Sequence, residues 1–415
     1  MMKKVFSLDI NQTFYYSALV FAFILSLSRA GISFFVLWFV LLFLIQNNFK
    51  ESWQTLKNNP TIQAMGLFLG FLFLSIFWSD NLSEAINQIR LYGYWIVIPI
   101  LAISLKKEWL PDLITAFLLG MFVNEILMYG VFFDFWQIKG HTHSDPCPFM
   151  NHIQYSVFLG TTAIILLNRL LSNRYTLREK SAILIFFFTT TTNLFISGGR
   201  TGQVAFWISI ALVVIIHYRA SIKSFILFLL ISSTLFISAY SLLPIFKERI
   251  QSISSDISLQ EKGIYNTSIG ARNGFWLIAY DAFKLHPLFG SGLGDYKYST
   301  KEALANNDYN FEASAIDFFK THDYHNQYLM ILVQLGLVGF SLMVWFIIKL
   351  YQIDIEDPEL KEISILSLTI FFISALAESL WIAQFPIILF IFIVSISLAA
   401  AKPSHPLSAE KKSAL

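Results

Sequence analysis

Apolar runs long enough to cross about 30 Å of hydrocarbon recur along almost the whole chain, with short polar connections between most of them. Hydrophobic residues make up 56% of the sequence and charged residues only 13%, and 42 of the 415 residues are Phe. A soluble domain carries roughly a quarter charged residues. The sequence therefore predicts an all-α polytopic membrane protein.

The apolar runs divide the chain into about twelve predicted membrane spans. The first two have the least defined boundaries, because only a few residues around Arg29 separate them. The predicted spans are Phe14–Leu27, Ile32–Ile45, Thr61–Trp78, Leu91–Leu105, Leu113–Phe133, Ile153–Leu167, Ala182–Ser197, Gly202–Ile216, Phe225–Leu243, Tyr324–Ile348, Ile363–Leu380 and Ile382–Ala401.

Lys and Arg are distributed unevenly between alternate connections, which predicts the orientation in the membrane. If Lys3 and Lys4 are cytoplasmic, the short outside loops carry few cations: Arg29, Arg90, Lys139 and Arg200. The cations expected inside are Lys50, Lys57, Lys106, Lys107, Arg169, Arg174, Arg178, Lys180, Arg219, Lys223, Lys349, Lys361, Lys402, Lys411 and Lys412. We therefore expect an even number of spans, both termini in the cytoplasm and no cleavable signal peptide.

One connection, Pro244–Asp323, is polar and far longer than the others, and the predicted orientation places it outside. It separates nine spans in residues 1–243 from three in residues 324–401, which a tail of residues 402–415 follows. A loop of this length is not needed to join helices, so we expect it to cover a site. Asn273–Leu285 has helical spacing, whereas Leu259–Glu261 and Lys301–Tyr309 are expected to be irregular.

Two segments resemble ligand sites only superficially. His286–Tyr296, HPLFGSGLGDY, is a Pro and Gly turn after the expected loop helix, and no strand precedes it as a nucleotide-binding loop requires. In HTHSDPCPFMNH, the side chains of His141, His143, Cys147 and His152 do not have the spacing of a usual zinc site. We favour loop histidines that are solvated or hydrogen-bonded, and we expect no metal and no cofactor.

Three arginines near the predicted outer boundary are candidates for binding an anion. Arg200, in SGGRTGQ, is placed by a glycine turn where its guanidinium reaches an outer-leaflet cavity, or else it is an interfacial anchor. Arg272 begins the expected loop helix and is either an anion ligand or a solvated charge. Arg90 follows an amphipathic segment expected to lie on the outer surface, and an interfacial anchor is its favoured interpretation.

A His-Asn pair, His325 and Asn326, stands at the mouth of the tenth predicted span. Ionisable groups are costly at that depth, so this position suggests function. A histidine can take a proton from an attacking hydroxyl, and arginine forks can neutralise a diphosphate as it leaves. His322 either shares this site or stabilises the loop, and Tyr328 is a supporting residue on the same helix start.

The sequence here resembles the superfamily of O-antigen ligases and polymerases. The pattern H-N-x9-G-x2-G, from His325 and Asn326 to Gly336 and Gly339, is similar to the signature of that family. The stretches RNGFW and HPLFGSGLG resemble the pattern that members carry in the same long periplasmic loop. Twelve spans with this loop between the ninth and tenth also resemble the family layout. Many relatives have Glu where this chain has Gln334.

The resemblance implies a glycosyltransferase of the bacterial inner membrane with its site on the periplasmic side. It implies His325 as the catalytic base and Arg200 and Arg272, with Arg90 less directly, as ligands of the diphosphate. The implied donor is a glycan on undecaprenyl diphosphate, and the implied acceptor is a sugar hydroxyl of lipid A-core oligosaccharide. The transfer would be inverting and metal-independent, and the partners would be these lipids and the bilayer, with no nucleic acid.

Four classes of protein remain open at this level. An O-antigen polymerase uses the same donor, although a single long loop late in the chain favours the ligase. A protein O-oligosaccharyltransferase usually has a large extra C-terminal domain. A transporter would show charged or Gly/Pro-broken positions near the middle of several spans and a repeat between halves. Asn124, Glu125 and Glu378 are the polar residues found in spans, and no repeat is evident.

Overall fold

The computed structural model describes residues 9–46, 49–218, 222–242, 244–265 and 267–401. In these residues the regular structure is helical, apart from isolated bridges between Thr142 and Asp145 and between Ile355 and Ala401. Lys3, Lys4, Arg219, Lys402, Lys411 and Lys412, which the predicted orientation used, lie outside the described residues.

A helix lies at every predicted span. The helices that correspond to spans are α1 (Ile10–Ile24), α2 (Arg29–Gln46), α4 (Pro60–Leu74), α6 (Val97–Ser104), α7 (Leu110–Phe132), α8 (His152–Leu171), α9 (Leu177–Ile196), α10 (Arg200–Tyr218), α11 (Ile222–Leu242), α16 (Gln327–Tyr351), α17 (Pro358–Ser374) and α18 (Gln384–Ala400). A short helix, α3 (Phe49–Lys57), precedes α4, and α5 (Leu82–Tyr92) precedes α6.

Six stretches in the described residues are long and apolar enough to cross a membrane: Arg29–Gln46, Pro60–Trp78, Leu82–Ser104, Lys107–Phe132, His152–Leu171 and Gln327–Tyr351. Shorter apolar helices cover 200–216 and 384–400. The chain is therefore a polytopic, all-helical membrane protein, and the number of twelve spans stays a prediction. The fourth predicted span, Leu91–Leu105, corresponds to the stretch Leu82–Ser104, which starts earlier because α5 continues through a 3-10 turn into α6.

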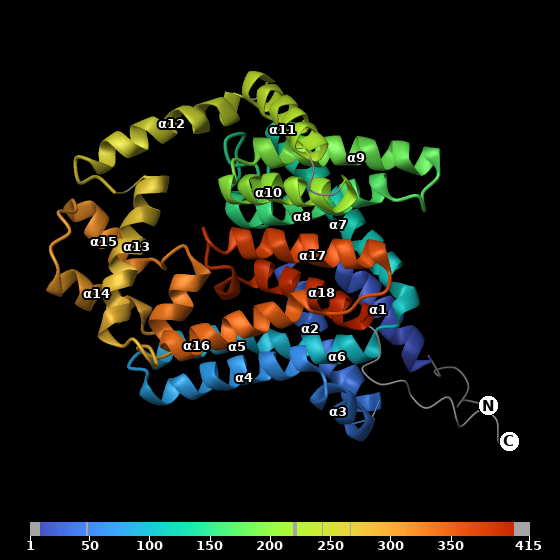
Figure 1. Cartoon of the computed structure of the whole chain (residues 1–415), viewed down its shortest axis with the longest axis horizontal. Helices are drawn as coiled ribbons and strands as arrows, with labels where there is room; N and C mark the ends of the chain where they lie inside the picture. The colour runs from blue at the N-terminus through green and yellow to red at the C-terminus, as the bar shows by residue number, and fades with distance from the viewer. Residues whose placement is uncertain (1–8, 47–48, 219–221, 243, 266, 402–415) are drawn as a thin grey trace.

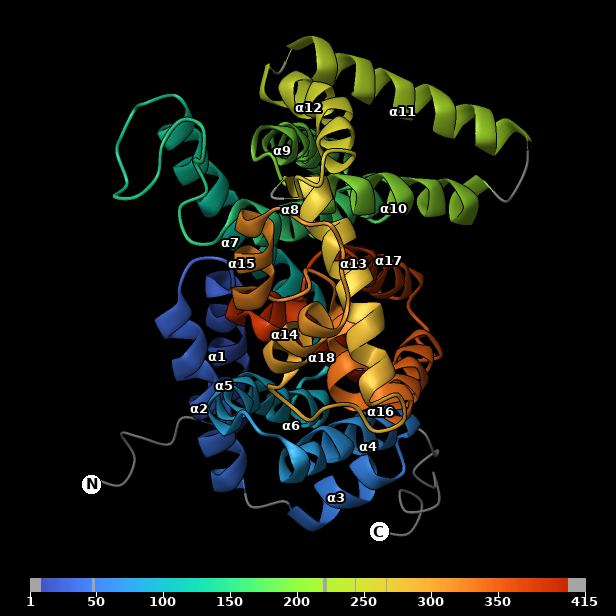
Figure 2. The same ribbon diagram turned by 90° about the vertical axis from the view of Figure 1, so that its left-hand side faces the viewer.

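The long connection is folded into four helices, α12 (Pro244–Gln260), α13 (Ser268–Leu285), α14 (Tyr296–Asn306) and α15 (Ala313–Thr321). They gather at one end of the bundle, which we call the loop end, and the opposite end we call the far end (Figure 1). Viewed from the loop end, α13, α14 and α15 lie in front of the membrane helices (Figure 2).

The expected helix at Asn273–Leu285 is confirmed, and it begins earlier because Thr267 caps α13 by accepting a hydrogen bond from the amide of Gly270. Its regularly spaced apolar residues, including Phe275, pack with Phe319 and Tyr324 into a core separate from that of the bundle. The prediction that Lys301–Tyr309 is irregular is wrong for its first part, which is helical to Asn306.

Helix α14 continues to Asn306 because Ala303 packs into this second core. The side-chain nitrogen of Asn307 then caps the end of the helix by donating a hydrogen bond to the Ala303 carbonyl at 3.0 Å. At the other expected irregular segment, Leu259 and Gln260 are the last residues of α12, and the chain turns between Glu261 and Gly263.

Helix α16 is broken at Gly336, where φ is 63° and ψ is −164°. An unbroken helix would bond the amides of Leu337 and Val338 to the carbonyls of Val333 and Gln334. Instead these amides donate to the carbonyls of Pro287 and Leu288, at 2.9 and 3.1 Å. The connector from α13 to α14 thus takes over helical hydrogen bonds of α16.

The exchange is reciprocal. The freed carbonyls of Val333 and Gln334 accept hydrogen bonds from the amides of Ser291 and Gly292, at 3.0 and 2.9 Å. A Cβ on Gly336 would lie 2.4 Å from the Leu288 carbonyl oxygen, so only glycine allows this approach. The turn predicted at His286–Tyr296 is confirmed, and its glycines allow close contact between two backbones.

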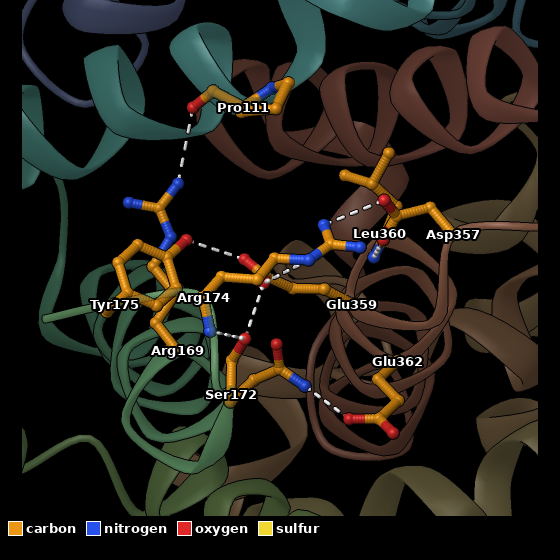
Figure 3. Close-up of polar contacts among 10 residues, drawn as sticks. Pro111, Arg169, Ser172, Arg174, Tyr175, Asp357, Glu359, Leu360 and Glu362 are labelled. Atoms are coloured by element: carbon orange, nitrogen blue, oxygen red, sulfur yellow. Dashed lines mark hydrogen bonds and ion pairs between the residues drawn. The ribbon is translucent and has the colours of Figure 1, made fainter.

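At the far end, polar side chains fix the start of α17 to the α8–α9 connector (Figure 3). Arg174 pairs with Asp357 at 2.8 Å, and Tyr175 donates to Glu359 at 2.7 Å. Ser172 also donates to Glu359, at 3.0 Å. This cluster holds the helix whose other end carries part of the candidate site.

The segment expected to contain loop histidines joins α7 to α8. Cys147 in this segment is buried and forms no disulfide, and His152 is the first residue of α8. The ring of His143 stacks on Phe132, with 4.4 Å between ring centroids. In the described part of the chain, no group of three or more His, Cys, Asp or Glu residues is placed to hold a metal.

Candidate functional site

Asn326 sets the start of α16 and ties it to the segment after α17. Its side-chain oxygen accepts hydrogen bonds from the amides of Tyr328 and Leu329, at 2.9 and 3.1 Å. Its side-chain nitrogen donates to the carbonyl of Leu376 at 2.9 Å. This N-cap explains why the helix begins at Gln327 rather than at the predicted Tyr324.

His325, just before that cap, has left-handed backbone geometry with φ of 46°. Few residues other than glycine adopt it, so the surrounding contacts must hold it there. One such contact is the hydrogen bond that the His325 amide donates to the Asp323 carboxylate at 2.8 Å. Asp323 also accepts a hydrogen bond from the Ser379 hydroxyl at 2.7 Å. The backbone before α16 is thereby fixed to the segment after α17.

The imidazole of His325 pairs with a carboxylate. Its Nδ1 lies 3.1 Å from Oε2 of Glu378, and its ring packs edge-on against Phe275, with 5.8 Å between centroids. The His325 and Glu378 side chains are 24% and 11% exposed, so water screens the pair only partly. With Nδ1 engaged, Nε2 is the ring nitrogen that can take a proton from another group.

Burial lowers the pKa of His325, but the hydrogen bond with Glu378 and the negative charges of Asp323 and Glu378 outweigh it, and the pKa is raised from its usual value. The positive charge of Arg272 acts in the opposite direction. The imidazole is therefore a stronger base than a free histidine, and its strength depends on the balance between Glu378 and Arg272.

Arg272 reaches the same place from α13. Its Nε donates to the carbonyl of Ala377 at 3.3 Å, next to Glu378. Burial lowers the pKa of Arg272, and the charge of Glu378 opposes this effect. His325, Arg272 and Glu378 therefore meet at the loop end, although they are far apart in the sequence.

Arg200 is the first residue of α10 and contacts α12. Its guanidinium donates to the Ser252 hydroxyl at 2.8 Å and lies 3.9 Å from the Asp256 carboxylate. At the other end of α12, Gln260 accepts a hydrogen bond from Asn273 at 2.8 Å. Ser252 and Gln260 lie about 12 Å apart along α12, since a helix rises about 1.5 Å per residue, so this helix contacts both Arg200 and the residue next to Arg272.

A groove of about 510 Å³ between α10, α11 and α12 has Arg200 on its wall. Its other walls are mainly apolar: they are formed by Gln203, Val204, Trp207, Ser232, Ser233, Phe236, Ile237, Phe246, Ile250 and Ile253. The prediction that Arg200 reaches a cavity therefore has a counterpart in the structure, and the groove can take a hydrocarbon chain beside a cation.

The remaining predicted residues are placed differently. Arg90 is exposed on the last turn of α5, a position compatible with its interpretation as an interfacial anchor. His322 is exposed and makes local contacts: Nδ1 lies 3.0 Å from the Phe318 carbonyl, and its ring stacks on the Phe318 ring. Tyr328 donates to the carbonyl of Phe372 at 2.8 Å. These contacts favour loop stabilisation for His322 and helix packing for Tyr328.

Sequence reasoning did not place Glu378 or Asp323 in the site. Glu378 was visible as a charged residue at the end of an apolar run, and such a residue is by default a functional candidate. Its partner could not be read from the sequence, because His325 lies 53 positions away in the chain. Asp323, beside the His-Asn pair, gave no pattern of its own.

Residues 185–344 match the family model described as O-antigen ligase. The match includes Arg200, Arg272 and His325 and ends before Glu378. An uncharacterized protein of Haemophilus influenzae is 30% identical over 161 residues, which is 37% of this chain and 38% of that protein. The chain therefore aligns with less than two thirds of this relative's length.

Proposed function

We propose that this chain, whose residues 185–344 match the O-antigen ligase family model, transfers a glycan from undecaprenyl diphosphate to a sugar hydroxyl of lipid A-core. The proposal places the protein in the bacterial inner membrane, with both termini in the cytoplasm and the loop end in the periplasm. The observation that supports it most is the His325–Glu378 pair, with Arg272 beside it, at the loop end of a helical membrane bundle.

Each group in the site has a role in such a transfer. Nε2 of His325 takes the proton of the acceptor hydroxyl, whose oxygen attacks the anomeric carbon of the donor sugar. The oxygen attacks the face of this carbon opposite to the diphosphate, and the bond from the carbon to the diphosphate breaks, so the anomeric configuration inverts. The diphosphate leaves as an anion with the bonding electron pair, and the proton on His325 passes to solvent.

Glu378 stabilises the imidazolium that forms when His325 takes the proton, because its carboxylate already faces Nδ1. Arg272 stabilises the charge that grows on the diphosphate, and Arg200 holds the same lipid from the side of α10. The proposal thus assigns the neutralising charge to arginines. Arg90, on the last turn of α5, is proposed only as an auxiliary contact with the headgroup.

The apolar groove beside Arg200 suits the lipid chain of the donor. The isoprenoid of the donor is already in hydrocarbon, so a wall such as Trp207 and Phe236 would hold it by close van der Waals packing rather than by removing it from water. The arrangement puts the diphosphate at the rim and the hydrocarbon inside the bilayer. Helices α12 to α15 would cover the site and help to position the acceptor.

The break in α16 does not favour a transporter. Transporters use broken helices to line a binding cavity near the middle of the membrane. The break at Gly336 is filled by backbone of the α13–α14 connector, from Pro287 to Gly292. A polymerase or a protein O-oligosaccharyltransferase would use the same groups on another acceptor, so these remain outcomes of the test.

The test is transfer by purified protein in lipid vesicles that contain a lipid-linked glycan and lipid A-core, with products separated by size and by the lipid that carries the sugar. We expect glycan on lipid A-core, and we expect His325→Ala to lower the rate about 10²- to 10⁴-fold, the usual contribution of a general base. His322→Ala is the matched control and should keep near wild-type activity, because its contacts are local.

Longer chains that remain on undecaprenyl diphosphate would identify a polymerase, and glycan on an added acceptor protein would identify an oligosaccharyltransferase. Absence of transfer to every acceptor would contradict the proposed class of reaction. Full activity of His325→Ala would refute the role of His325 while leaving the reaction itself in place.

A further inference from the structure

The connector between α13 and α14 has an unusual composition for a segment outside a predicted span. From Pro287 to Gly294 it reads PLFGSGLG and contains no charged residue, with His286 before it and Asp295 after it. Leu288 and Phe289 are 58% and 56% exposed. A water-exposed loop rarely combines large exposed apolar side chains with a complete lack of charge.

Five successive amides of this connector, from Gly290 to Gly294, are paired within the protein, as membrane-embedded backbone has to be. The amide of Gly290 donates to the His286 carbonyl at 3.0 Å, and that of Leu293 donates to the Ser75 hydroxyl at 3.2 Å. The amide of Gly294 donates to the side-chain oxygen of Gln334 at 2.6 Å.

The two amides between these, from Ser291 and Gly292, bond to α16 as described for the helix break. Every amide from Gly290 to Gly294 therefore has a partner in the protein. None of these five amides needs a hydrogen bond to water, so hydrocarbon beside Gly290–Gly294 would meet no unpaired amide.

The depth of the connector follows from the two helices that it contacts. At the far end, the Thr61 hydroxyl of α4 donates to the Lys349 carbonyl of α16 at 3.2 Å, so these ends are level. Gly336 is thirteen residues from Lys349, or about 20 Å along a helix. A hydrocarbon core is about 30 Å thick, so with Lys349 near its far boundary the break lies within it.

The contacts with α4 give the same level. The connector touches Ser75 and Ser79, where the hydroxyl of Ser79 donates to the Leu293 carbonyl at 2.7 Å. These residues close the apolar stretch Pro60–Trp78 at the loop end. Leu337, which follows the break, is itself 46% exposed. The apolar side chains of the connector and of α16 therefore face outward at one depth, just inside the boundary of the bilayer.

We propose that Pro287–Gly294 is a re-entrant segment whose partner is the lipid bilayer, with Leu288 and Phe289 inserted into the leaflet at the loop end. The segment enters beside α16, exchanges backbone hydrogen bonds at Gly336 and leaves at Asp295. It thereby fixes α13 to the membrane at a set height. If the proposed function is correct, this height holds Arg272 at the level of lipid headgroups.

The test measures the surroundings of position 289 in the full-length protein in lipid nanodiscs. Cys147, the single cysteine, is first replaced by Ala, and Phe289→Cys is labelled with a small environment-sensitive fluorophore. Quenching is measured with iodide in the water and with a nitroxide on the lipid acyl chains. Lys301→Cys, exposed on α14, is the water control, and Leu119→Cys, 53% exposed on α7, is the lipid control.

We expect the label at position 289 to match the label at position 119, with several-fold weaker quenching by iodide than at position 301 and strong quenching by the nitroxide. Quenching at 289 that matches position 301 would overturn the proposal. If Phe289→Cys does not fold, Leu288→Cys gives the same measurement on the neighbouring side chain. The result is independent of catalysis, so an inactive protein would leave this inference standing.

Discussion

Replacement of Glu378 by Gln changes the charge beside His325 while it keeps the size of the side chain and an oxygen that can accept from Nδ1. In the structure these two groups are 3.1 Å apart and only partly exposed. A hydrogen bond to a charged group contributes about 1.5–3 kcal/mol and a neutral one about 0.5–1.5 kcal/mol, so the loss is about 1–2 kcal/mol. That difference corresponds to a decrease of about 5- to 30-fold in kcat/KM.

The same substitution should move the pH dependence in a defined direction. A general base works only when it is neutral, so activity is present above the pKa of His325 and is lost as the pH falls through it. The carboxylate of Glu378 raises this pKa. In Glu378→Gln the pKa should therefore be lower, and the acid limb of the pH–rate profile should shift to lower pH.

The assay is the initial rate of transfer in vesicles as a function of pH, with donor at low concentration so that kcat/KM is measured. Glu359→Gln is the matched control, because Glu359 accepts hydrogen bonds from Ser172 and Tyr175 at the start of α17, whereas Glu378 follows the other end of this helix. It should leave the acid limb in place. A slower Glu378→Gln enzyme with an unshifted acid limb would refute the electrostatic role of Glu378. A shift to higher pH would refute the expectation that Glu378 raises the pKa of His325.

Two further substitutions test the neighbouring parts of the site. Arg272→Met should raise KM for the lipid-linked donor about 10- to 150-fold, from the loss of a charged contact of about 1.5–3 kcal/mol. It should also shift the acid limb to higher pH, because Arg272 lowers the pKa of His325; an unchanged KM would contradict its contact with the diphosphate. Gly336→Ala should lower the free energy of unfolding by about 1–3 kcal/mol, because this backbone geometry is essentially limited to glycine. A new Cβ would also meet the Leu288 carbonyl oxygen at 2.4 Å, whereas Gly66→Ala in α4, with nothing within 4 Å, should be neutral or slightly stabilising. Thermal unfolding of the purified variants in detergent compares their stabilities. Equal stability would contradict the exchange of backbone hydrogen bonds between α16 and the connector at Gly336.

Much of the architecture follows from local patterns, and these predictions were confirmed. Apolar runs locate a helix at each expected span because a helix in hydrocarbon satisfies its own backbone. The spacing around Phe275 predicts α13, since an amphipathic helix buries one face. The error at Lys301–Asn306 has a tertiary cause: the burial of Ala303 extends α14 where the local sequence indicates no regular structure.

The sequence by itself determined that the chain is a helical membrane protein, that a long segment interrupts it, and that His325 and Asn326 stand where an apolar helix begins. These features depend on composition and on neighbours in the chain. Only the tertiary structure decided that Glu378 and Arg272 meet His325 and that α16 opens at Gly336. Such contacts depend on how distant helices pack, and no local spacing encodes which carboxylate, guanidinium or backbone amide will arrive at a given end of the bundle.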